Sequence, residues 1–202
     1  GGYKGMFIAW LERSIWTISG TGAYGGGVVI DLQRRRTNAR TGTVSHRTVA
    51  RIPQGGAFTD HDGAQIKFNE VVLAYLTPNK DIRVFDGNND HVISHAKERT
   101  LKRMTFAARH KAFCYDDTER SIVNWVFPID GALEPNWQVS WNYEHGTWTE
   151  SPYGFACVTE VENATGGRQL LAGESNLATG GFCYRLWEGF TRDGIALAAQ
   201  VM

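Results

Sequence analysis

Two groups of side chains have types and spacings that could support chemistry. Asp116, Asp117 and Glu119 lie close together in the sequence, and paired carboxylates are the catalytic groups of most glycosidases. These acids lie between two apolar runs, however, in the position of a hairpin turn, where charged side chains face water. We therefore expect a solvated turn and no catalytic residue at this point.

The second group consists of histidines. His91 and His95 have the H-x-x-x-H spacing that would place two imidazoles on one face of a helix for a metal ion, and His61 precedes Asp62 upstream. The residues between His91 and His95 are typical of a loop and a strand, and Ser94 is suited to be the N-cap of a helix that starts after it. A zinc site also needs further ligands, which this neighbourhood does not offer. We expect no metal and no cofactor.

The segment QVSWNYEHGTWTES, residues 138–151, combines large aromatics with a His-Gly pair. Alternation predicts one packed strand face, formed by Trp137, Val139, Trp141 and Tyr143. Gly146 then supplies the turn, and Trp148 begins the return strand. We expect a structural corner here.

A sialidase-like turn motif, S-x-D-x-G-x-x-W, is the alternative for the same segment. Ser140 and Asn142 fit its first positions only with Asn in place of Asp, and Gly146 and Trp148 then fall at the wrong offsets. The motif therefore fails on spacing. A matching motif would in any case mark a turn away from the active site.

The composition favours an all-β protein. The 202 residues include 23 Gly, only five Pro and 12% aromatics, which is typical of short strands joined by tight turns. Lys plus Arg equals Asp plus Glu at 21 each, so no global charge attracts nucleic acid or an anionic membrane. No apolar run reaches the length of a membrane span, which is about 20 residues. We expect no membrane span.

The three cysteines, Cys114, Cys157 and Cys183, are far apart and form no C-x-x-C pair. This argues against a disulfide framework or a zinc knuckle, and we interpret them as small apolar strand residues. The chain begins at GGYKG and stops inside the apolar run IALAAQVM. We therefore expect a fragment of a longer chain.

Strand-like runs recur along the chain, each closed by turn residues. Asp-Gly, a dipeptide typical of hairpin turns, occurs four times, at Asp62-Gly63, Asp86-Gly87, Asp130-Gly131 and Asp193-Gly194. One segment differs: SHAKERTLKRM predicts a short connecting helix near residues 94–104, with Leu101, Met104 and Ala108 on one face.

Short antiparallel strands at near-regular spacing leave a sandwich, a barrel or a propeller. A repeated four-strand grouping with aromatics near turns favours a β-propeller of four-stranded antiparallel blades. At roughly 40 to 50 residues per blade, residues 1–202 correspond to about four blades of a single propeller domain. Further sequence or partner chains would then complete the ring.

The order of the motifs supports this interpretation. The chain presents LERSIWTISGTG, GGAFTDHDGAQIKFN, DIRVFDGNNDHVIS, ARHKAFCYDDTERSIVNWVFPIDG, VSWNYEHGTWTE and CYRLWEGFTRDG in succession. This succession resembles β-propeller tail proteins of tailed bacteriophages, the group that includes nozzle or tail-tubular components of short-tailed phages. The resemblance covers about residues 7–194.

The resemblance implies a structural, non-enzymatic virion protein in the phage tail, assembled in the host cytoplasm. Such proteins form homo-oligomeric rings around the DNA exit path and contact other tail proteins, so transient passage of genome DNA is implied as well. The alternative is a tail-associated propeller that binds or cleaves glycans, with Trp10, Trp16 and Trp187 as its exposed aromatics. Alternation places most of these aromatics in packing positions, which favours the structural role.

A basic cluster completes the candidate sites. Four arginines, Arg34, Arg35, Arg36 and Arg40, lie in the segment QRRRTNAR, which we expect to be an exposed loop. A solvated loop, contact with DNA phosphates and a salt-bridged subunit interface are the three explanations. DNA in a tail channel must pass without sticking, so the interface is preferred to DNA contact.

Overall fold

The computed structural model describes residues 2–20, 32–59, 62–162, 166–174, 183–186, 191–192 and 195–196. Within these residues the protein is mostly β, its sheets are antiparallel, and there is one short α-helix, as the sequence predicts. The chain divides into two compact units, Gly1–Gly154 and Phe155–Met202. Of the predicted features, Trp187, Asp193-Gly194 and His61 lie outside the described residues.

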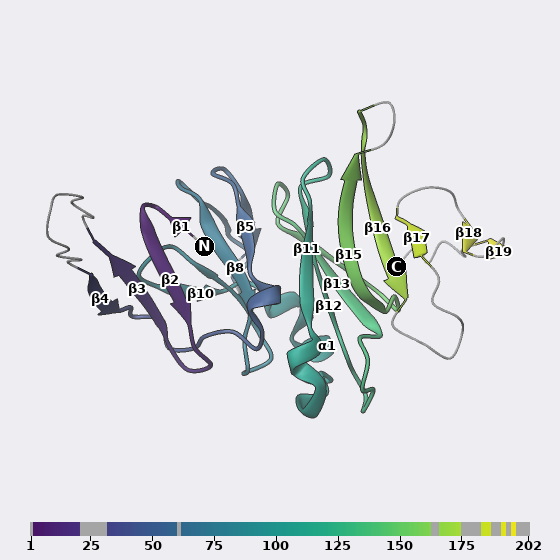
Figure 1. Cartoon of the computed structure of the whole chain (residues 1–202), viewed down its shortest axis with the longest axis horizontal. Helices are drawn as coiled ribbons and strands as arrows, with labels where there is room; N and C mark the ends of the chain where they lie inside the picture. Colours follow the sequence, from purple (N-terminus) through teal and green to yellow (C-terminus); the bar gives the residue numbers. More distant parts are fainter. Residues whose placement is uncertain are drawn as a thin grey trace, which may run out of the picture. The chain divides into compact units, whose positions relative to one another are not determined.

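The first unit contains three four-stranded sheets within its described residues (Figure 1). The first sheet has the order β1 (Gly2–Tyr3), β2 (Met6–Trp10), β3 (Ile15–Ser19) and β4 (Gln33–Arg36). The second has the order β10 (Asp90–Val92), β9 (Ile82–Phe85), β8 (Val72–Leu76) and β5 (Ala50–Ile52). The third is a meander of β11 (Phe113–Asp117), β12 (Ile122–Phe127), β13 (Trp137–Asn142) and β14 (Thr147–Ser151).

A hairpin of β6 (Ala57–Thr59) and β7 (Gln65–Lys67) interrupts the second sheet between β5 and β8. The second unit contains a three-stranded sheet of β15 (Phe155–Glu162), β16 (Arg168–Glu174) and β17 (Cys183–Arg185). It also contains a two-stranded ladder of β18 (Thr191–Arg192) and β19 (Ile195–Ala196).

Helical structure follows the second sheet, as predicted. A 3-10 turn at His95–Lys97 leads into α1 (Glu98–Lys102), and further 3-10 segments occupy His46–Thr48 and Phe106–Lys111. The predicted apolar positions Leu101, Met104 and Ala108 are all buried. No helix among the described residues is long and apolar enough to cross a membrane.

The predicted capping role of Ser94 is wrong. Ser94 occupies the position before the 3-10 turn, but its side chain caps no helical N–H. Its Oγ instead accepts a hydrogen bond of 2.8 Å from the backbone N–H of Ile82 in β9. Ser94 therefore attaches the start of the helical segment to the second sheet.

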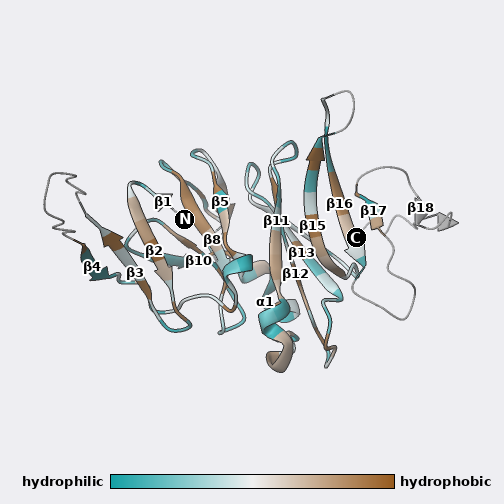
Figure 2. Ribbon diagram, in the orientation of Figure 1, coloured by the Kyte–Doolittle hydropathy of each residue, from teal (hydrophilic) through white to brown (hydrophobic). Residues whose placement is uncertain are grey.

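The second sheet is buried on both faces, because alternate residues of β8 belong to different hydrophobic clusters. Ala74 and Leu76 pack in the larger cluster, which also includes Trp125 and Trp141 of the third sheet. Tyr75 packs in the smaller cluster, which includes residues of the first sheet. Figure 2 shows β8 as hydrophobic, whereas β4 at the edge of the first sheet is hydrophilic. The second sheet is thus the middle layer of the three.

A charged network lies at the edge of this middle layer. Arg83 in β9 contacts Asp90 at 2.8 Å and Asp81 at 3.0 Å, and Asp90 also accepts a hydrogen bond of 3.2 Å from the Tyr75 hydroxyl. The Asp90 side chain is only 6% exposed. Burial by itself would lower the pKa of Arg83, but the hydrogen bonds and charges of Asp81 and Asp90 raise it above its ordinary value. Arg83 therefore stays charged inside the network.

We expect Asp90→Ala to lower the free energy of unfolding by about 3 kcal/mol, because it removes one partner of a largely buried ion pair and leaves Arg83 undercompensated. Urea denaturation at neutral pH measures this change. Glu119→Ala, at an exposed turn position, is the control and should change the free energy of unfolding by less than about 0.5 kcal/mol. Equal effects of the two substitutions would contradict the role of the network.

The cysteines differ in their exposure. All three lie in strands, but Cys157 and Cys183 are exposed, in contrast to the predicted apolar role, whereas Cys114 is partly buried. Burial, together with the nearby charge of Asp116, raises the pKa of the Cys114 thiol to about 12. The thiolate is the reactive form of cysteine, so Cys114 is protected at neutral pH.

We therefore expect Ellman's reagent to modify Cys157 and Cys183 of the native protein rapidly at pH 8. Cys114 should react only after denaturation, because its raised pKa and its burial leave almost no accessible thiolate at that pH. A Cys114→Ser variant should show an unchanged rapid phase. A rapid phase that decreases in this variant would show that the Cys114 thiol is accessible.

Candidate functional site

The predicted aromatic corner lies in the third sheet. Trp141 is fully buried in β13, and Trp148 in β14 is its register partner, with the two rings stacked at 5.8 Å. Trp125 in β12 stacks on both rings, at 6.5 Å from Trp141 and 6.2 Å from Trp148. Tyr143 follows β13 and contacts Trp141 edge to face at 6.2 Å. The arrangement fills the core and leaves no open aromatic platform.

Gly146 forms the turn between β13 and β14 and contacts a distant part of the chain. Its φ is +68°, in the left-handed region that favours glycine. A Cβ atom at this position would lie 3.1 Å from the Thr59 hydroxyl oxygen of β6. Gln65 of β7 donates a hydrogen bond of 2.9 Å to the carbonyl oxygen of the neighbouring His145. The corner therefore holds the β6–β7 hairpin against the third sheet.

The acidic group and the histidines, whose residue types could support chemistry, lie in different sheets or the segments that follow them. The predicted solvated turn is wrong for the two aspartates, because Asp116 and Asp117 end strand β11 and Asp117 is only 4% exposed, with Arg120 bound to it at 3.0 Å. Glu119 is exposed in the turn that follows. His91 lies in edge strand β10, and His95 begins the 3-10 turn after it. Within the part of the chain that the structure describes, no group of three or more potential ligands could hold a metal ion.

The arginine cluster was predicted to be an exposed loop, but Arg34, Arg35 and Arg36 belong to edge strand β4. Only Arg40 lies outside the strand. Arg34 is the register partner of Ile18, and Arg36 is the partner of Trp16. Arg35 points to the opposite face of the sheet, since neighbouring strand residues alternate. All four arginines, including Arg40 beyond the strand, are exposed. The strand was missed because its sequence, QRRR, lacks the apolar alternation that identifies half-buried strands.

The outer face of the first sheet brings Arg34 and Arg36 beside apolar residues. One row across the strands contains Phe7, Ile18 and Arg34, and the next contains Ala9, Trp16 and Arg36. Phe7 is 55% exposed. We call these six residues the outer face. It combines exposed apolar surface with two cations.

Trp10 and Trp16, the candidate aromatics for glycan binding, lie on opposite faces of the first sheet. Trp10 packs inward, with its ring 4.8 Å from that of Tyr75 and 5.9 Å from that of Phe85. Trp16 lies on the outer face, and its indole N–H donates to Ser14 Oγ at 3.1 Å. Trp10 is therefore a core residue and does not join Trp16 on one surface.

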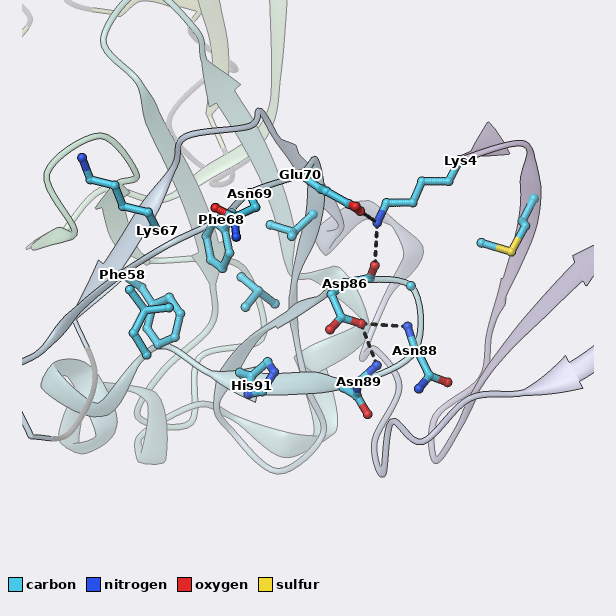
Figure 3. A pocket seen from close by; sticks show the side chains of 15 residues that line it. Lys4, Phe58, Lys67, Phe68, Asn69, Glu70, Asp86, Asn88, Asn89 and His91 are labelled. Carbon is cyan, nitrogen blue, oxygen red and sulfur yellow. Dashed lines mark hydrogen bonds and ion pairs between the residues drawn. The ribbon is translucent and has the colours of Figure 1, made fainter.

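A cleft of about 620 Å³ lies elsewhere in the first unit, and sequence reasoning missed it (Figure 3). Segments from the start of β2, the β6–β7 hairpin, and the β9–β10 turn contribute to it. Its apolar wall includes Phe58 and Phe68, whose rings stack at 5.5 Å, together with Val72 and Val84. The lining residues come from separate parts of the sequence, and only the FNE and DGNND stretches hinted at polar groups close to turns.

Polar side chains line the other part of the cleft. Figure 3 shows Lys4 pointing toward Glu70 and toward the backbone of Asp86. Lys4 forms an ion pair with Glu70 and donates a hydrogen bond of 2.9 Å to the Asp86 carbonyl oxygen. The Asp86 carboxylate accepts the backbone N–H groups of Asn88 and Asn89, both at 2.8 Å. Burial favours a raised pKa for Asp86, but these hydrogen bonds lower it overall.

Comparison with known proteins assigns no family. No family model matches the chain, and a search of curated proteins finds no matching sequence.

We expect Gly146→Val to destabilise the protein by about 2 to 3 kcal/mol, since valine is strained at positive φ and its Cβ would crowd Thr59. Gly131→Val is the matched control, because Gly131 has a φ of +82° but nothing within 4 Å of an added Cβ. It should cost about 1 to 2 kcal/mol. Equal losses in urea denaturation would show that contact with the β6–β7 hairpin contributes nothing.

Proposed function

We propose that this chain is part of a β-propeller and serves as a non-enzymatic structural protein of a bacteriophage tail. In this role it forms a homo-oligomeric ring around the DNA exit path and contacts other tail proteins through its loops. The protein is then located in the virion tail, after assembly in the host cytoplasm.

The observation that carries the proposal is the middle layer of the first unit. In a propeller, each four-stranded sheet packs face to face against the sheets before and after it. The second sheet has this environment, with Ala74 and Leu76 in one cluster and Tyr75 in the other. The ordered motifs that resemble phage tail propellers supply the second argument.

The outer face supports assembly through a further layer. The first sheet buries Ile8 and Ile15 on its inner side, whereas its outer face exposes Phe7 and presents Trp16 and Ile18 only partly covered. Apolar surface of this kind favours contact with another sheet. Arg34 and Arg36 border it and would pair with acidic groups across an interface.

We expect the protein to form ring-shaped particles of a single subunit number, measured by native mass spectrometry and negative-stain electron microscopy. Arg34→Glu/Arg36→Glu should shift the distribution toward monomer, because it reverses both charges on the outer face. Arg35→Glu/Arg40→Glu is the matched control, with the same change in net charge but outside that face. It should leave the particles intact.

Two outcomes would contradict the proposal. One is a wild-type protein that stays monomeric at every concentration tested, and the other is equal disruption by both pairs of substitutions. Fluorescence anisotropy with duplex DNA at low salt provides a separate check on the arginines. Tight, salt-dependent binding lost equally in both variants would favour phosphate contact over an interface.

A further inference from the structure

The cleft of the first unit has an apolar side with an aromatic character. Phe58 is 4% exposed and lies beneath the cleft surface, whereas the half-buried Phe68 stacks on it with an angle of 21° between the rings. Figure 3 shows both rings on the same side of the cleft. Phe58 thus supports Phe68 from behind, and Phe68 presents a fixed aromatic surface to a ligand.

The charged groups of the cleft compensate one another. Lys4 and Lys67 are matched in number by Glu70 and Asp86. Lys4 is already engaged by Glu70 and by the Asp86 backbone. A phosphate or carboxylate ligand therefore meets no excess of positive charge, so an uncharged ligand is favoured.

Further polar groups remain available for such a ligand. Asn69, Asn88 and His91 line the cleft, and their side chains make no hydrogen bond to any residue that the structure describes. A side-chain amide both donates and accepts, and an imidazole ring offers two nitrogens for hydrogen bonds. Hydroxyl groups, which also donate and accept, are the ligand groups that match this set.

We propose that the cleft binds a short neutral oligosaccharide. The C–H face of one sugar ring would lie on Phe68, and its hydroxyl groups would hydrogen-bond to Asn69, Asn88 and His91. A cleft of about 620 Å³ lies within the size range of small-molecule sites and has room for two or three sugar units. This inference does not depend on the proposed ring, since every residue involved belongs to one chain.

The site is suited to binding and not to hydrolysis. Glycoside cleavage requires a carboxylic acid that stays protonated, together with a second carboxylate. Glu70 is bound to Lys4, and the hydrogen bonds that Asp86 accepts from its own turn lower its pKa. Neither group is arranged as a general acid, so bound sugar is retained intact.

The test is isothermal titration calorimetry of the whole protein with maltotriose, cellotriose, triacetylchitotriose and mannotriose, with trigalacturonic acid as an anionic comparison. We expect at least one neutral trisaccharide to bind with a Kd of about 1 mM, and trigalacturonic acid to bind more weakly. Phe68→Ala and Asn88→Ala should each weaken that binding about tenfold or more, which corresponds to about 1.4 kcal/mol.

Control substitutions outside the cleft distinguish loss of the binding site from a general effect of mutation. Phe106→Ala removes a phenylalanine that is 56% exposed outside the cleft, and Asn79→Ala removes an exposed asparagine outside it. Both should bind like the wild type. If circular dichroism shows that Phe68→Ala is unfolded, Asn88→Ala and Asn69→Ala provide the test, because Asn69 is exposed and Asn88 is only half-buried.

Three results would overturn the proposal. The first is the absence of binding by all four neutral trisaccharides at about 10 mM, ten times the expected Kd. The second is binding that survives in the folded cleft variants, which would place the sugar elsewhere. The third is binding of trigalacturonic acid alone, which would identify an anion site. Release of reducing sugar from a bound trisaccharide would contradict the absence of hydrolysis.

Discussion

The first unit depends on one constraint, which is that the sheet of β5, β8, β9 and β10 has no face toward water at its centre. A strand buried on both sides needs apolar residues at consecutive positions, and β8 supplies them in the sequence VLAYL. The side chains of this strand therefore pack against a different sheet on each face. Ala74 and Leu76 pack in the cluster that includes the third sheet, and Tyr75 packs in the cluster that includes the first.

Polar groups at the margins of the middle sheet make its position specific. Apolar packing alone is tolerant of sliding, whereas a buried donor needs one acceptor at one place. The indole N–H of Trp125 reaches the carbonyl oxygen of Thr48 at 3.0 Å, which fixes the third sheet against the segment before β5. Arg83 and Asp90 fix the opposite side, where Tyr75 joins their network. Burial of apolar side chains therefore stabilises the contact between the layers, and a few hydrogen bonds fix their relative position.

The predictions that succeeded rest on local signals. Alternation of large side chains identified β13 and β14, and the glycine between them has the positive φ that its place in a hairpin implies. The helical segment was found from its composition and its apolar spacing. Such signals are complete within a few residues, so a single sequence is enough to read them.

The predictions that failed depended on partners far along the chain. β4 is a strand because β3 provides hydrogen bonds to it, although three of its four residues are charged. β5 pairs with β8 across the inserted β6–β7 hairpin, and no local pattern announces that pairing. Serine is a residue type that commonly caps helices, but the hydroxyl oxygen of Ser94 accepts a hydrogen bond from the backbone N–H of Ile82 instead. Tertiary contacts decided each of these cases.

The cleft shows the same principle at the level of a site. A rigid stack of sheets leaves its turns and edge strands as the parts free to vary, because their backbone is not needed for packing between layers. Phe68 follows β7, Asp86 and Asn88 belong to the turn after β9, and Lys4 belongs to the turn after β1. These segments meet only because the first two sheets and the hairpin are held together by the core. A surface built in this way can acquire a ligand without disturbing the layers, so structural and binding roles are compatible in one chain.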